Sequence, residues 1–203
     1  MNDRQLLAAR GRRLEYITIL WNCLEGLLAL VAAAMAGSVS LMGFGLDSFI
    51  EVTSGTAVLW RMSTDHDTEL REQRERLALR IVGISFIALA LYVVVEAMRD
   101  LIARAAPEAS PLGIAVAGAS LIAMPLLARA KRRTAAAMGS RAMHADAAQT
   151  DFCAYLSGIL LAGLGLNAAF GLWWADPIAG LAMVPIMVSE GVKALRGDPC
   201  DCD

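Results

Sequence analysis

Apolar runs of about 20 residues recur along this chain, and they limit the folds open to it. A helix of that length is what is needed to cross the roughly 30 Å hydrocarbon core of a bilayer. The sequence is 57% apolar with a mean hydropathy of +0.54, too apolar for a soluble domain with a charged surface. Its net charge of −2 offers no basic surface for nucleic acid. We therefore expect an all-helical, multi-pass membrane protein without a nucleic-acid partner.

Six membrane-crossing helices are expected, joined by loops rich in charge or proline. They cover approximately residues 14–35, 37–61, 77–98, 112–130, 142–172 and 178–195. Residues 1–13 form a cytoplasmic basic arm, residues 14–196 the six-helix transmembrane bundle, and residues 197–203 a short cytoplasmic tail.

Basic residues are distributed unequally between the two ends of the expected bundle. Sixteen Lys or Arg fall in the arm, the loops after the second and fourth helices, and the tail, whereas Arg99 and Arg104 fall on the opposite side. The positive-inside rule then places both termini in the cytoplasm of an inner or plasma membrane. We interpret these basic loops as a topology signal rather than a binding site for an anionic partner.

Two carboxylates lie well inside the second apolar stretch. At about 100° per residue, Asp47 and Glu51 face the same direction, one helical turn apart. An isolated carboxylate at the centre of a spanning helix costs on the order of 3 kcal/mol, so the pair needs a compensating partner. Hydrogen bonding between helices, worth only about 0.6 kcal/mol on average, compensates poorly. A divalent cation or a relayed proton fits better.

A second polar stripe lies on the fifth expected helix. One face of that helix carries Asp146, Gln149, Thr150, Cys153 and Ser157. Because the fifth helix runs antiparallel to the second, Gln149 and Thr150 come level with Glu51. Cys153 comes level with Asp47. The two stripes can therefore meet and enclose a site, although interhelical hydrogen bonding explains the Ser, Thr and Gln residues equally well.

The donor set of these stripes suits a transported metal ion. Carboxylates one turn apart supply two oxygen ligands from one helix. Adding an amide oxygen and a thiolate gives a set between hard and soft preferences, so zinc, cadmium, cobalt, iron and manganese are all candidates. We expect no permanently bound cofactor and no enzymatic activity.

Three motifs together resemble the transmembrane portion of the cation diffusion facilitator, or cation efflux, family. They are SLMGFGLDSFIEVTSG, the ADA that opens the fifth helix, and the ADPI turn before the sixth. The resemblance covers about residues 14–196. It implies a six-span, usually dimeric carrier that moves divalent metal ions outward in exchange for protons. It also matches the acidic metal-binding pair of the family's second span to Asp47 and Glu51.

The resemblance leaves the ligands of the fifth helix open. Aligning on ADA places Gln149 and Cys153 at the family's ligand positions, and we prefer this alignment because it agrees with the stripe. Aligning on the acidic residue instead selects Ala147 and Asp151, and Asp151 points away from the stripe. Asp146 is a further candidate. The chain resembles a short subgroup without the cytoplasmic domain that most members carry.

Two other functions remain open at this stage. The same site would serve a membrane metal sensor or partner subunit that does not transport, and intramembrane carboxylates would also suit a carrier of small organic cations. On the first helix, Asn22 and Glu25 share a face and either line the pathway or pair structurally.

Several polar residues outside the stripes have weaker expectations. Asp176 is expected to cap the sixth helix. His66, His144 and the tail thiols of Cys200 and Cys202 are either metal-collecting groups or ordinary solvated side chains.

Overall fold

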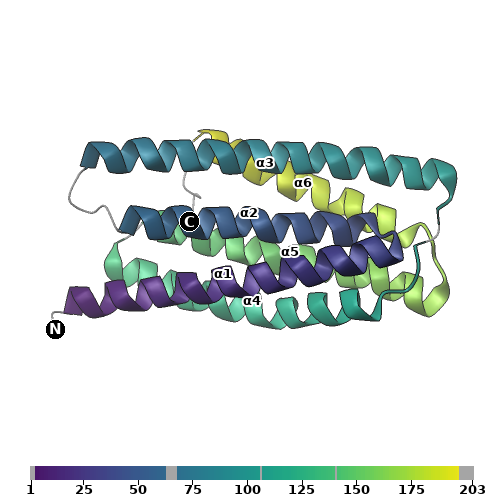
Figure 1. Cartoon of the computed structure of the whole chain (residues 1–203), viewed down its shortest axis with the longest axis horizontal. Helices are drawn as coiled ribbons and strands as arrows, with labels where there is room; N and C mark the ends of the chain where they lie inside the picture. Colours follow the sequence, from purple (N-terminus) through teal and green to yellow (C-terminus); the bar gives the residue numbers. More distant parts are fainter. Residues whose placement is uncertain (1–2, 63–67, 106, 140, 197–203) are drawn as a thin grey trace.

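The chain folds into a bundle of long helices. A computed structural model describes all residues except 1–2, 63–67, 106, 140 and 197–203. The described residues form α1 (Asp3–Ala36), α2 (Val39–Met62), α3 (Thr68–Ala103), α4 (Pro111–Met138), α5 (Arg141–Phe170) and α6 (Ala175–Arg196). Figure 1 shows α2 and α5 in the middle, α1 and α4 along one side, and α3 and α6 along the other. The expected all-helical six-helix bundle is confirmed.

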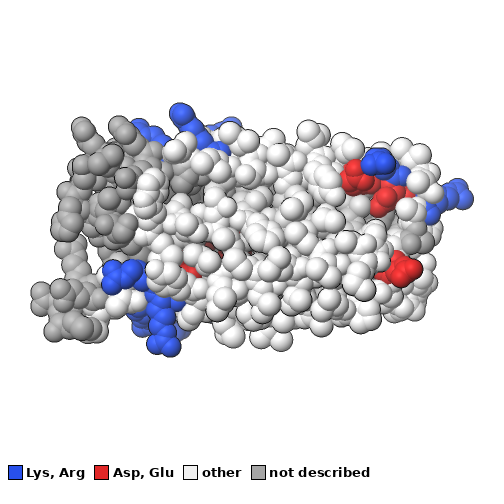
Figure 2. Space-filling view, viewed as in Figure 1, with Lys and Arg blue, Asp and Glu red and all other residues white. Residues whose placement is uncertain are grey.

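The outer surface of the bundle is suited to lipid. In the described part of the chain, α1, α3, α4, α5 and α6 each contain a segment long and apolar enough to cross a membrane. The 24 residues of α2 also reach far enough, about 36 Å, but its inward polar face lowers its hydropathy. Large apolar side chains such as Leu20, Ile102 and Phe170 are more than 70% exposed. Figure 2 shows a broad uncharged band between two charged ends, as a multi-pass membrane protein requires.

Three helices extend further than the sequence predicted; α3 runs from Thr68 to Ala103, beyond the expected residues 77–98. α1 begins at Asp3, so the segment expected to be a basic arm is largely a continuation of the first helix. α4 continues through its basic run to Met138, because the Ala-rich segment that follows contains no helix breaker before Gly139. Gly139 ends the helix in the left-handed region, with φ 61° and ψ 33°.

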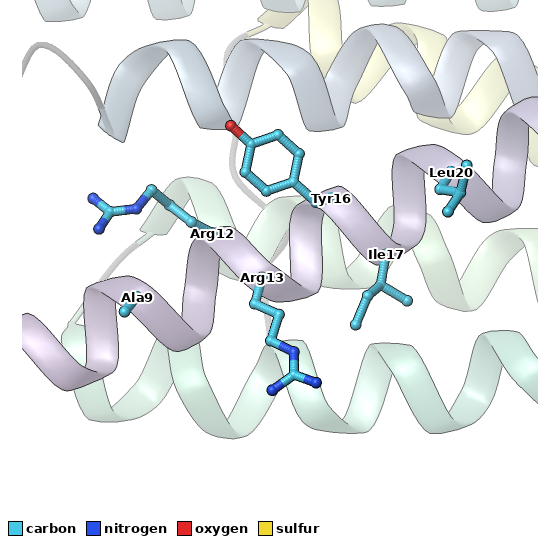
Figure 3. Close-up of a pocket in the computed structure, with 6 residues that line it drawn as sticks. All are labelled: Ala9, Arg12, Arg13, Tyr16, Ile17 and Leu20. Carbon is cyan, nitrogen blue, oxygen red and sulfur yellow. The ribbon is translucent and has the colours of Figure 1, made fainter.

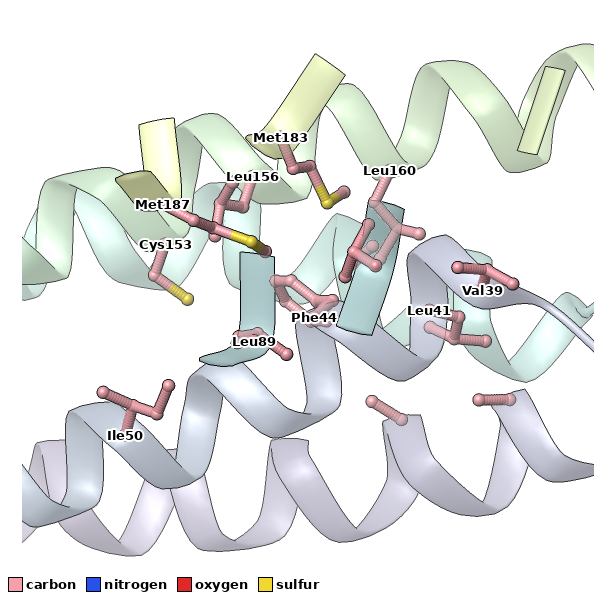
Figure 4. Close-up of a cluster of buried hydrophobic side chains, with 14 of the residues drawn as sticks. Val39, Leu41, Phe44, Ile50, Leu89, Cys153, Leu156, Leu160, Met183 and Met187 are labelled. Carbon is pink, nitrogen blue, oxygen red and sulfur yellow. The ribbon is translucent and has the colours of Figure 1, made fainter. Parts of the chain in front are cut away.

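Small residues let the helices approach closely. A Cβ on Gly163 of α5 would lie 2.5 Å from the Cβ of Ala179 on α6. A Cβ on Gly83 of α3 would lie 2.8 Å from the carbonyl oxygen of Gly191 on α6. Such contacts replace the hydrophobic drive that helices lack inside a membrane. The apolar core gathers side chains from several of these helices, including Phe44, shown in Figure 4.

The position of Asp176 differs from the expectation that its side chain caps the sixth helix. It lies in the first turn of α6, but its carboxylate does not cap that helix; it binds the start of α2 instead. Oδ1 accepts from the hydroxyls of Ser38 at 2.6 Å and Ser40 at 2.5 Å. Oδ2 accepts from the backbone N–H groups of Val39 at 3.0 Å and Ser40 at 3.4 Å. The first N–H groups of α2 thus find their acceptor on α6, since no intrahelical acceptor exists for them.

Candidate functional site

Asp47 and Glu51 point into the bundle and not toward lipid. Their side chains are 4% and 2% exposed. Thr150 of α5 donates to Glu51 Oε1 at 2.7 Å, and Ser54 of α2 donates to Asp146 Oδ1 at 3.2 Å. These two contacts confirm that the polar stripes of α2 and α5 face each other in the antiparallel register that the sequence predicted.

Several polar atoms at this level lack a protein partner. Within the described residues, Glu51 Oε2 and Gln149 Nε2 are buried without a hydrogen bond. Asp47 likewise forms no hydrogen bond or ion pair with a described residue. Leaving a buried polar group unsatisfied costs about 1–3 kcal/mol, and more for a charged one. A cluster of such atoms therefore indicates a place for a ligand.

Glu25 of α1 is held by donors from four helices. Oε1 accepts from Ser48 of α2 at 3.0 Å and from the thiol of Cys153 on α5 at 3.5 Å. Oε2 accepts from Trp21 Nε1 of α1 at 2.5 Å and from Ser120 of α4. These bonds fix a carboxylate beside the α2–α5 stripes. The bond to Cys153 places Glu25 in direct contact with the stripe of α5.

Asn22 lies one turn from Glu25 and is fully buried. Neither its amide nitrogen nor its amide oxygen has a hydrogen-bond partner among the described residues. α1 and α2 pack antiparallel, with Glu25 bonded to Ser48. By that register, Asn22 comes level with Glu51, three residues further along each helix. Its carboxamide is therefore a further unsatisfied oxygen donor near the same depth.

Lys131 is the functional candidate that the sequence analysis missed. The distribution of basic residues predicts a loop charge at this position, yet the Lys131 side chain on α4 is 0% exposed. Nζ lies 3.1 Å from Glu15 Oε2, pairs with Asp146, and donates to Thr150 Oγ1 at 3.3 Å. The sequence of α1 contains a signal for a buried acidic partner of Lys131, because polar side chains recur there every three or four residues, as on one face of a helix. That stripe consists of Glu15, Thr18, Asn22 and Glu25.

The structure separates the two acidic candidates of α5 from the unsatisfied atoms. Asp151 forms a partly exposed ion pair with Arg132 of α4. Asp146 is engaged by Lys131 and Ser54. His144 is half-buried near the start of α5, whereas His66, Cys200 and Cys202 lie outside the described residues.

Taken alone, the His, Cys, Asp and Glu side chains do not form a ready metal cage. Across the described residues, no group of three or more of them is arranged to hold a metal ion. A cation at the α2–α5 level would therefore need amide and hydroxyl oxygens besides the carboxylates of Asp47 and Glu51.

A surface depression lies away from these acids. It follows the outer face of α1 and is lined by Ala9, Arg12, Arg13, Tyr16, Ile17 and Leu20, as Figure 3 shows. Arginine and tyrosine on an otherwise apolar face are typical of a membrane–water interface. The depression offers no carboxylate to a cation.

Comparison with known proteins identifies the family of the chain. The profile of the family described as the cation efflux transmembrane domain matches residues 16–197, which includes every residue of the α2–α5 site. Transmembrane protein 163 of Xenopus laevis is 28% identical over 186 residues, which are 89% of this chain and 64% of that protein. The chain thus spans a little less than two thirds of that relative's length. The chain belongs to the cation efflux family and carries its transmembrane domain.

Proposed function

We propose that this protein transports divalent metal cations across a membrane and binds them between α2 and α5. One observation carries the proposal. Two carboxylates, Asp47 and Glu51, are buried one turn apart, and Glu51 Oε2 has no partner among the described residues. Membership of the cation efflux family supports the same reading.

The ligand set combines charged and neutral donors. Asp47 and Glu51 supply the negative charge that a divalent cation needs on losing its water. Gln149 and Asn22 lie level with Glu51, and Cys153 lies level with Asp47. These three side chains can complete the coordination with amide oxygen or sulfur. This mixture suits borderline ions, among them zinc, cadmium, cobalt, iron and manganese. Asp146 and Asp151 are weaker candidates because Lys131 and Arg132 already neutralise them.

We further propose export in exchange for protons, by a homodimer in the cell membrane with both termini cytoplasmic. Protons compete with a metal ion for the same carboxylates, because only the ionised form of Asp47 or Glu51 binds the metal. Metal affinity is therefore expected to fall as pH falls. A proton gradient directed against the metal flux would then drive transport.

The test is uptake into proteoliposomes loaded with a metal-sensitive dye, with and without a pH gradient. Zinc, cadmium, cobalt, manganese and iron form the panel. The parent should transport at least one of them, faster with the gradient. Asp47→Asn and Glu51→Gln should lose that flux. The melting temperature of these variants should no longer rise when metal is added.

The matched control is Glu96→Gln, which neutralises an acid of α3 that pairs with Arg99 three residues away, outside the site. It should transport like the parent. Equal metal binding by Asp47→Asn and the parent would refute the assigned site, and metal binding without flux would favour a sensor.

A further inference from the structure

Lys131 is a positive charge enclosed by acids from three other helices. Glu15 of α1 and Asp146 of α5 contact its ammonium directly. Glu51 of α2 is linked to the ammonium through the hydroxyl of Thr150. The neighbouring Arg132 on α4 faces elsewhere, toward Asp151. Among the described residues, the buried ammonium contacts Glu15, Asp146 and Thr150, which line the interior of the bundle.

A single hydroxyl joins this ammonium to the proposed metal site. Nζ of Lys131 donates to Thr150 Oγ1 at 3.3 Å, and Thr150 Oγ1 lies 2.7 Å from Glu51 Oε1 as a donor. α2 also packs directly against the ion pair, since a Cβ on Gly55 would lie 3.4 Å from Glu15 Oε2. The ion pair and the metal site therefore belong to one continuous polar interior.

The chemistry of lysine suits movement between these acids. Its ammonium is a compact charge on a flexible four-carbon stem, with three donors that can be redirected. A bare carboxylate in a membrane interior is costly, so Glu51 is stabilised whenever a cation approaches it. A divalent ion bound at Glu51 would repel the ammonium across the short distance spanned by Thr150.

We propose that Lys131 is a tethered cation that competes with the transported metal for Glu51. Without metal, the ammonium contacts Glu15 and Asp146 and also donates to Thr150, whose hydroxyl bonds to Glu51, so it offsets the charge of Glu51. With metal bound, the ammonium is held back by Glu15 and Asp146. Lys131 stays protonated throughout, so the exchange is one of position. This inference deepens the proposed function and rests on it.

Two variants should shift metal affinity in opposite directions. Lys131→Gln combined with Asp146→Asn removes the ammonium and one of its acids, so the local net charge is unchanged. It should tighten metal binding, for example of cadmium or manganese measured by titration calorimetry, by roughly tenfold. Glu15→Gln keeps the ammonium but removes one acid that holds it back. It should weaken binding by a similar factor.

The neighbouring ion pair provides the matched control. Arg132→Gln with Asp151→Asn removes an equal pair of charges from the same two helices, facing away from the site. It should leave metal affinity unchanged. If Lys131 merely stabilised the fold, the charge-neutral Lys131→Gln/Asp146→Asn variant would not bind metal more tightly in a protein that remains folded.

The outcomes separate this inference from the proposed function. If the parent binds no metal, the proposed function fails. If the parent binds metal and Asp47→Asn does not, while Lys131→Gln/Asp146→Asn binds no more tightly, only the tethered-cation inference is overturned. Should that double variant not fold, Glu15→Gln/Lys131→Gln decides, because it also removes the ammonium without changing the local net charge, and unchanged or weaker metal binding in it would overturn the inference.

Discussion

At the scale of single residues, helical periodicity predicted which side chains of α2 and α5 face each other. The periodicity predicts Thr150 level with Glu51, and Thr150 Oγ1 lies 2.7 Å from Glu51 Oε1. The spacing within each helix and an antiparallel pairing are enough to obtain this match. The partners of Asp151 and Lys131 could not be obtained that way, because both depend on how α4 packs against α1 and α5.

The two ways of aligning the fifth-helix ligands make different predictions for Asp151. Because Asp151 pairs with Arg132 and is 22% exposed, Asp151→Asn should leave metal affinity unchanged. It should lower the unfolding free energy by at most about 1 kcal/mol, as an exposed ion pair does. Titration calorimetry and thermal melting measure the two effects. Loss of metal binding in Asp151→Asn would favour the alternative alignment.

At the scale of the helices, the sequence predicts the number and order of the helices, whereas it does not predict the residues at which several of them begin and end. The charge of the basic run around Lys131 predicts a loop, because loops of membrane proteins are often rich in charge. Local propensity favoured helix there, since the Ala-rich segment continues unbroken to Gly139. The longer helix carries Lys131 into the interior of the bundle, a position that a loop would not give it.

Helix packing gives a prediction with a control on the same helix. Gly163→Ala would force its Cβ against the Cβ of Ala179 and separate α5 from α6. Overpacking of this kind typically costs about 1–3 kcal/mol. Gly165→Ala meets nothing within 4 Å and should be neutral or slightly stabilising. The temperature of thermal unfolding in detergent should therefore fall for Gly163→Ala only. Equal melting temperatures of the two variants would contradict the packing argument.

At the scale of the whole molecule, the charge distribution still favours one orientation. Without the buried Lys131, fifteen Lys or Arg remain on the predicted cytoplasmic side, against Arg99 and Arg104 on the other. The sequence therefore predicts which end faces the cytoplasm, through a rule that concerns insertion and not packing.

Labelling with a membrane-impermeant maleimide tests this orientation. In a background with the four native cysteines replaced by serine, we expect Glu108→Cys, exposed between α3 and α4, to react in intact cells. Arg10→Cys, exposed on the first turns of α1, should react only after permeabilisation. The opposite pattern would place the termini outside.

The clasp between Asp176 and the first turn of α2 has a mechanical consequence. Four bonds tie the beginnings of α2 and α6 together, with Oδ1 and Oδ2 each holding two donors. A rigid helix that is held at its first turn can move most at its opposite end. We therefore expect any tilt of α2 relative to α6 to be smallest at Asp176 and larger in the half of α2 that carries Glu51.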